Sequence, residues 1–215
     1  MRKHYEKRLE ELNRKMLNMA SRVEEAVDRC VKALQERDMS LARQVVKEDE
    51  KIDKMEREIE EECIKITALQ QPVAGDLRII TAISKITTDL ERIGDHAVNI
   101  AEMVLEIGEQ KLIKPLEDVP RMAEIATSRL HQSLEAFTEL DAARAEELAR
   151  QDEKIDRCDE QILRELITLM MEDCSNLEQA VRLIFISRFL ERIGDHTTNI
   201  CEKLIYAATG ERADY

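Results

Sequence analysis

Apolar residues recur at intervals of three and four along most of the chain, and the clearest run lies at residues 83–104. This spacing puts apolar side chains on one face of an α-helix and is typical of a helix packed in a bundle. The stripe consists of Ile83, Ile86, Leu90, Ile93, Ala97, Ile100 and Val104. The pattern therefore predicts a long amphipathic helix.

Helical spacing predicts six helices in all. They span residues 4–37, 39–70, 76–107, 118–139, 142–172 and 176–208. Asp38 and Asp141 each precede a helix and suit the N-cap position, where a carboxylate accepts hydrogen bonds from free backbone N–H groups. Ser175 with Glu178 predicts a capping box before the last helix.

The chain repeats itself. DEKID occurs at 49–53 and 152–156, and LERIGDHAVNI at 90–100 returns as LERIGDHTTNI at 190–200. The offset falls from 103 to 100 residues between these blocks, where QQPVAGDL faces the shorter DCSNL and a loop is expected in both copies. An internal repeat of this length indicates two similar units. The sequence predicts an all-α fold of two tandem three-helix bundles, at 1–108 and 118–215, joined by a linker at 109–117.

Composition agrees with this fold and limits the partners. Five glycines, three prolines and 3% aromatic residues argue against an all-β fold. The net charge of −13 and the lack of a basic block disfavour direct binding of nucleic acid or of an anionic membrane. An acidic surface attracts cations or a basic patch on a protein.

A cytoplasmic location is expected. No apolar run approaches the roughly 18 residues of a membrane-spanning helix, and MRKHYEKRLEEL lacks the apolar segment of a signal peptide. The five cysteines form an odd set without a CxxC motif, so we expect reduced thiols packed in helices.

Both repeats carry pairs of acidic residues four positions apart. The pairs are Asp49/Asp53, Glu91/Asp95, Asp152/Asp156 and Glu191/Asp195. Residues four apart lie on one helix face, where like charges are mildly destabilising unless a cation lies between them. Such carboxylates suit a hard divalent or trivalent metal.

Chance alone predicts about three [DE]xxxD matches in a chain of this composition, and the sequence contains five. The fifth, Glu24/Asp28, aligns with Thr127/His131 in the other repeat and is interpreted as background. The other four pairs occur in both copies, which favours a metal site over a merely solvated face.

Helix angles place Glu91, Asp95 and Glu102 opposite the apolar stripe, and Asp49 and Asp53 on the flank of their own helix. The metals are therefore expected on the outside of each bundle. Ferritin-like di-iron proteins instead hold metals inside, with Glu-x-x-His motifs, and this chain has no such motif.

Four further residues are weaker candidate ligands, namely Glu102, Glu202, His96 and His196. For the histidines a structural hydrogen bond competes with ligation. Gly94 and Gly194 lie within helices at a cost of about 1 kcal/mol relative to alanine, which indicates close helix packing or the approach of an ion.

The duplicated LERIGDHxxNI and DEKID, together with QQPVAGDLR at 70–78, resemble the PhoU family of phosphate-signalling proteins over essentially the whole chain. The second copy departs from the pattern, with MEDCSNLEQ at 171–179. The resemblance implies two three-helix bundles with surface clusters of iron or zinc held by the four acidic pairs of both repeats. Mg or Mn also suit carboxylate sites.

The resemblance also implies a role. Members of the family are cytoplasmic adaptors, often homodimers, that bind the ATPase subunit of the phosphate ABC transporter and a sensor histidine kinase. They keep the phosphate-starvation response off and restrain phosphate uptake. The resemblance thus implies a protein that is not an enzyme.

Two alternatives remain. One is an enzyme with a surface multinuclear metal centre, and the other is a metal-free helical interaction module whose acids only solubilise it. The enzyme has little support, because the chain has no glycine-rich phosphate loop, no GxSxG and no HExxH motif.

Overall fold

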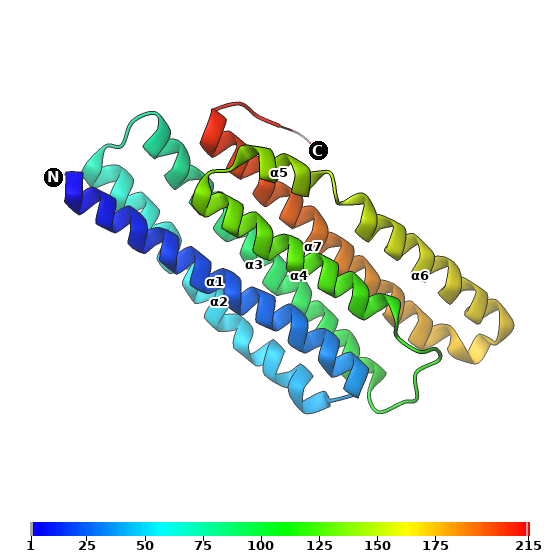
Figure 1. The fold of residues 1–215 in the computed structure, drawn as a ribbon. Coiled ribbons are helices and arrows are strands. Elements are labelled where there is room, and N and C mark those ends of the chain that lie inside the picture. The colour runs from blue at the N-terminus through cyan, green and yellow to red at the C-terminus, as the bar shows by residue number, and fades with distance from the viewer. Residues whose placement is uncertain (1, 214) are drawn as a thin grey trace.

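The structure, a computed structural model, describes the backbone of residues 2–213 and 215 and the side chains of residues 5–213 and 215. Regular structure in this part of the chain is entirely helical (Figure 1). The elements are α1 (Arg2–Glu36), α2 (Met39–Gln70), α3 (Gly75–Ile107), α4 (Asp118–Glu139), α5 (Ala142–Ala149), α6 (Glu153–Glu172), the 3₁₀ helix η1 (Cys174–Asn176) and α7 (Leu177–Thr209).

The helices form two bundles that lie side by side with their axes roughly aligned (Figure 1). α1, α2 and α3 pack on one another, and α7 packs on α4, α5 and α6. α3 also packs on α7, and the two run in opposite directions, because Asp89 contacts His196 while Glu106 pairs with Arg182. The predicted all-α fold of two tandem bundles is confirmed.

The predicted apolar stripe is the core face of α3. Each of its seven residues is at most 1% exposed. The equivalent positions of α7, one hundred residues later, are buried in the same way, from Leu183 to Leu204. Burying one such aliphatic side chain contributes about 1.5–3 kcal/mol, so the two stripes hold each bundle together.

Five of the six predicted helices begin and end within two residues of the expected positions. Both predicted aspartate caps are confirmed. Asp38 accepts hydrogen bonds from the backbone N–H groups of Ser40 and Leu41, and Asp141 accepts one from Arg144.

The capping box predicted from Ser175 and Glu178 is wrong. Asp173 accepts the Ser175 backbone N–H at 2.9 Å and turns the chain into η1. α7 consequently starts two residues later than Ser175, with Asn176 at its N-cap and no side-chain capping bond. A carboxylate two residues upstream has taken the N–H group that the capping box needed free.

The prediction of one continuous helix over 142–172 is also wrong, because α5 ends at Ala149 and α6 begins at Glu153. In a continuous helix the Leu148 carbonyl would accept a hydrogen bond from the backbone N–H group of Asp152. Here it accepts hydrogen bonds from the guanidinium of Arg129 and from the backbone N–H of Gln151. The backbone N–H of Asp152 donates instead to the Ala149 carbonyl. A side chain from α4 therefore takes over the carbonyl at the break.

All five cysteines are free thiols, and Cys30, Cys63 and Cys201 are buried in helices as expected. The expectation of packed thiols is wrong for Cys174, which is exposed in η1. None of the helices in the described part of the chain is long and apolar enough to cross a lipid bilayer.

The two mid-helix glycines allow close helix packing. A Cβ atom on Gly94 would lie 3.3 Å from Ile52 Cδ1 of α2. A Cβ atom on Gly194 would lie 2.9 Å from Ile155 Cδ1 and 3.0 Å from Asp152 Oδ1. Because each glycine faces the preceding helix, it sets how closely the acidic pairs of the two helices approach.

We expect Gly194→Ala to destabilise the protein by about 1–2 kcal/mol, because Asp152 and Ile155 must both move to admit the methyl group. The free energy of unfolding of Gly94→Ala is expected to stay within about 0.5 kcal/mol of that of the wild type. The gain of about 1 kcal/mol in helix propensity offsets the milder contact of the added methyl group with Ile52. Urea unfolding measures both free energies. A Gly194→Ala protein as stable as Gly94→Ala would contradict this.

Candidate metal centres

The first repeat brings together all four of its predicted carboxylates. Asp49 and Asp53 come from α2, and Glu91 and Asp95 come from the facing part of α3. Asp49 interacts electrostatically with Asp53 and Asp95, and Glu91 interacts with Asp95 and Asp53. We call these four residues the first cluster.

Two oxygens of the first cluster are buried without a hydrogen-bond partner, namely Asp49 Oδ1 and Glu91 Oε2. Burial, helped by the Asp53 and Asp95 charges, raises the pKa of Asp49 from 3.8 to about 6. Burial and the Asp95 charge raise the pKa of Glu91 from 4.5 to about 7, against the lowering effect of Arg92. The cluster thus holds negative charge that the protein does not fully compensate.

The nearest compensating charge is Arg92 of α3. Its Nη1 donates to Asp95 Oδ2 at 3.0 Å, and its Nε lies 3.4 Å from Glu91 Oε2. The Arg92 side chain is 56% exposed, so water screens most of its effect. Asp49 has no such partner at its buried oxygen.

The second repeat brings together the other four predicted residues. Asp152 lies at the N-terminus of α6 and Asp156 in its first turn, while Glu191 and Asp195 lie on α7. Burial raises the pKa of Asp156, and the Asp152 and Asp195 charges add to the effect. Burial also raises the pKa values of Glu191 and Asp195. We call these four residues the second cluster.

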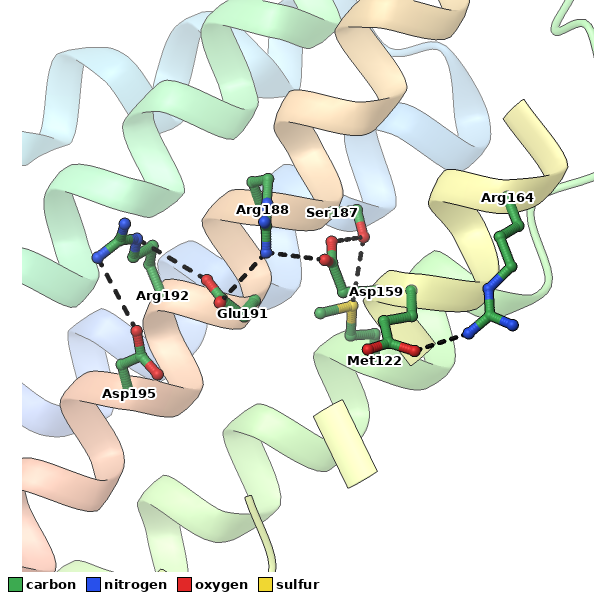
Figure 2. Close-up of polar contacts among 9 residues, drawn as sticks. Met122, Asp159, Arg164, Ser187, Arg188, Glu191, Arg192 and Asp195 are labelled. Atoms are coloured by element: carbon green, nitrogen blue, oxygen red, sulfur yellow. Dashed lines mark hydrogen bonds and ion pairs between the residues drawn. The ribbon is translucent and has the colours of Figure 1, made fainter. Parts of the chain in front are cut away.

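Arginines compensate the second cluster more fully than the first. Figure 2 shows Arg188 between Asp159 of α6 and Glu191 of α7, at 3.0 Å and 3.3 Å. Arg192 lies 3.8 Å from Glu191 Oε2 and 4.0 Å from Asp195 Oδ2 (Figure 2). The guanidinium of Arg129, from α4, contacts Asp152.

The structure adds residues that the spacing rule missed. Glu56 interacts electrostatically with Glu91, and Asp159 with Glu191 and Asp156. Glu56 and Asp159 are equivalent positions, 103 residues apart. Each lies three residues after the second Asp of DEKID, on the same helix face. Extending the duplicated block by one turn would have found them.

The expectation that the carboxylates lie on an open outer face is only partly right. The side chains of Asp95 and Asp195 are 35% and 45% exposed, but those of Glu91 and Glu191 are only 16% and 19% exposed. The glycine contacts draw α2 and α6 close to the α3 and α7 helices. The acidic pairs consequently line a half-buried seam between two helices.

The four weaker candidates lie apart from this seam or are engaged elsewhere. Glu102 is exposed, and Glu202 lies 3.6 Å from Lys203 and accepts the Tyr215 backbone N–H. His196 Nδ1 is 2.9 Å from Asp89 Oδ1. The His96 ring stacks on Phe189 and lies 5.6 Å from the His196 ring, so both imidazoles belong to the α3–α7 contact.

The donor set fits a hard cation. Both clusters offer carboxylate oxygens, which suit Mg²⁺, Mn²⁺, iron and zinc, and each has a buried carboxylate oxygen without a hydrogen bond. Within the described side chains, no three His, Cys, Asp or Glu residues are placed so that they could hold one metal ion together. Binding would therefore require the carboxylates to rotate toward a common point, against their mutual repulsion.

Comparison with known proteins agrees with the duplication. The PhoU domain family model matches residues 16–104 and again 119–204. The phosphate-specific transport system accessory protein PhoU homolog of Clostridium acetobutylicum is 40% identical over 214 residues, covering 99% of this chain and 98% of that protein. The corresponding Escherichia coli K12 protein is 36% identical over 203 residues, covering 94% and 84%.

Solved structures show the same fold. The phosphate transport system regulatory protein PhoU from Streptococcus pneumoniae has a TM-score of 0.92 and 32% identity, covering 98% of this chain and 100% of that one. PhoU from Pseudomonas aeruginosa has a TM-score of 0.91 and 39% identity, covering 96% and 100%.

The relatives are named accessory and regulatory proteins rather than enzymes, which confirms the expectation of a non-enzymatic protein. The family model covers most of both repeats, and the relatives are similar over nearly the whole chain. The chain therefore belongs to the PhoU family.

Proposed function

We propose that this protein is a cytoplasmic, metal-binding adaptor of phosphate transport. It would bind the ATPase subunit of a phosphate ABC transporter and a sensor histidine kinase, and so restrain both phosphate uptake and the starvation response. The names of its relatives, which are accessory and regulatory proteins of phosphate transport systems, support this role. Self-association into a homodimer is part of the proposal.

An exposed apolar stripe on α7 supports the adaptor role most directly. Leu177, Val181 and Phe185 follow one another at intervals of four and are 55%, 39% and 50% exposed. The Phe185 ring stacks on Phe189 one turn further on, with centroids 6.4 Å apart. Contiguous apolar surface of this kind typically marks a protein-interaction site.

Only the first residue of the stripe has an apolar equivalent in the other repeat, because Leu177 aligns with Leu77, which is 39% exposed. The equivalents of Val181 and Phe185 on α3 are Thr81 and Lys85, both exposed and polar. Since the two helices have similar cores, packing within the bundle does not account for the difference. A contact that involves the second repeat alone would account for it. Met103 and Glu106 of α3 line a groove beside the stripe.

The clusters support the metal part of the proposal. Two facing helices hold carboxylates in each half, and in the first half the buried oxygens of Asp49 and Glu91 have no hydrogen-bond partner. A bound cation would compensate this charge and tie α2 to α3. The alternative, a metal-free interaction module, is separated from the proposal by the first two tests below.

Purified without an affinity tag, the protein is expected to contain metal, and Glu91→Gln/Asp95→Asn is expected to lose the metal of the first cluster. Elemental analysis measures the metal content, and circular dichroism checks the fold. Glu102→Gln is a matched control on the same helix and should keep its metal. Metal-free wild-type protein that does not take up Mn²⁺, Fe²⁺ or Zn²⁺ would refute the metal proposal.

Metal-stripped protein should become less stable as pH rises from about 4 to about 7. The raised pKa values of Asp49 and Glu91 mean that the folded state binds these protons more tightly than the unfolded state, so their loss costs stability. The expected fall is about 1–3 kcal/mol, since one pKa unit corresponds to about 1.4 kcal/mol. Urea unfolding at several pH values measures it.

Glu91→Gln should flatten that fall, because the amide carries no charge at any of these pH values. Saturating metal should also flatten it, since the cation compensates the ionised carboxylates. Stability that rises with pH in the metal-stripped wild type, and equally in Glu91→Gln, would contradict the pKa values on which this expectation rests.

Phe185→Glu is expected to weaken binding to one or both proposed partners by about tenfold or more, because it places a charge within the apolar stripe. Lys85→Glu, at the equivalent position of the first repeat, is the matched control and should bind normally. Pulldown with the purified ATPase subunit and with the kinase measures both. Wild-type protein that binds neither partner would refute the adaptor role.

A further inference from the structure

The two clusters differ in one buried charge. Aligned at the repeat offsets, Asp152 of the second repeat matches Asp49 of the first, but Arg129 matches Ala26 and Thr198 matches Val98. The second repeat thus has a cation and a hydroxyl group where the first has two apolar side chains.

Arg129 is anchored from three directions. Its side chain is 3% exposed, and Nη1 contacts the Asp152 carboxylate. Nη2 donates to the Leu148 carbonyl at 3.1 Å and to Thr198 Oγ1 at 3.0 Å. Thr198 and the opened carbonyl at the α5–α6 break therefore hold the guanidinium against Asp152. This set of contacts fixes a positive charge inside the second half of the protein.

The first repeat has a small cavity at the equivalent place. It measures about 20 Å³, and Ala26, Val98, Asp49 and Gly94 are among the residues that line it. A cavity of that size admits one water-sized particle. Asp49 Oδ1, which is buried and has no hydrogen-bond partner, belongs to a residue of this lining. α2 also runs unbroken through this position.

A fixed guanidinium affects metal binding in two ways. It engages an oxygen of Asp152 that a metal would otherwise use, and its charge repels an incoming divalent cation over a few ångströms.

In the first repeat Ala26 and Val98 stand at the positions of Arg129 and Thr198 and carry no charge. Arg22, Arg29 and Lys51 also line the cavity, but Arg29 and Lys51 donate to Glu48. The charges that shift the pKa of Asp49 are those of Asp53 and Asp95, both acidic. The two clusters hold equivalent carboxylates, but an incoming metal ion meets the additional positive charge of Arg129 in the second cluster.

We infer that Arg129 is a built-in counterion of the second cluster, and that the two repeats consequently bind divalent cations unequally. The first cluster is the tight site, where the cation compensates Asp49 as Arg129 compensates Asp152. The second cluster is the weak site. This inference rests on the proposed metal-binding function.

The test titrates Mn²⁺ into the metal-stripped full-length protein and reads free Mn²⁺ by electron paramagnetic resonance. Wild type should show two affinity classes. Asp49→Asn should remove the tight class, and Asp152→Asn should leave the tight class unchanged. Arg129→Ala/Thr198→Val, which copies the first repeat, should raise the affinity of the weak class by about tenfold or more.

A second variant guards against misfolding. Arg129→Gln removes the charge but keeps amide donors for the Leu148 carbonyl and Thr198. It should also raise the affinity of the weak site for Mn²⁺. Arg144→Gln is the control, because Arg144 is also part of an ion pair but contacts Glu135 rather than a cluster. Circular dichroism and thermal unfolding confirm that each variant is folded.

The outcomes separate the two proposals. Equal affinity of the two clusters in wild type, or no change of the weak class in a folded Arg129→Gln protein, overturns the inference and leaves metal binding standing. If no variant and no wild-type protein binds Mn²⁺, with Zn²⁺ and Fe²⁺ giving the same result by elemental analysis, then the metal-binding function fails and the inference fails with it.

Discussion

The close packing of one helix on the next at a glycine is the constraint on which the rest of this structure depends. Gly94 lets α2 approach α3, and Gly194 lets α6 approach α7. The buried aliphatic stripes beneath these contacts supply the free energy that holds carboxylates of facing helices together despite their repulsion. The acidic seam is thus imposed by the core.

Duplication made much of this architecture readable from the sequence. A helix period and two aspartate caps are local features, and they were sufficient for five helices and their ends. The pairing of Asp49/Asp53 with Glu91/Asp95 also followed, because both blocks recur at nearly the same offset and their helices are neighbours in the chain.

The remaining features depend on contacts between distant residues. Nothing in the apolar pattern of 142–172 indicates a break, because the break depends on a guanidinium that reaches over from α4. The burial of Glu91 likewise depends on how closely α2 packs against α3. The failed capping box had a local cause, since Asp173 competes for the Ser175 N–H group. Sequence spacing gives the face of a helix, but the distance to the neighbouring helix comes from packing.

The stripe on α7 has a consequence for stoichiometry. Two repeated halves would ordinarily offer a ligand two similar faces, and a partner could then occupy both at once. Here Val181 and Phe185 have no apolar equivalents on α3. A protein that recognised Val181 and Phe185 would therefore find one binding site on each chain, in one orientation, and the internal symmetry of the fold would not extend to that complex.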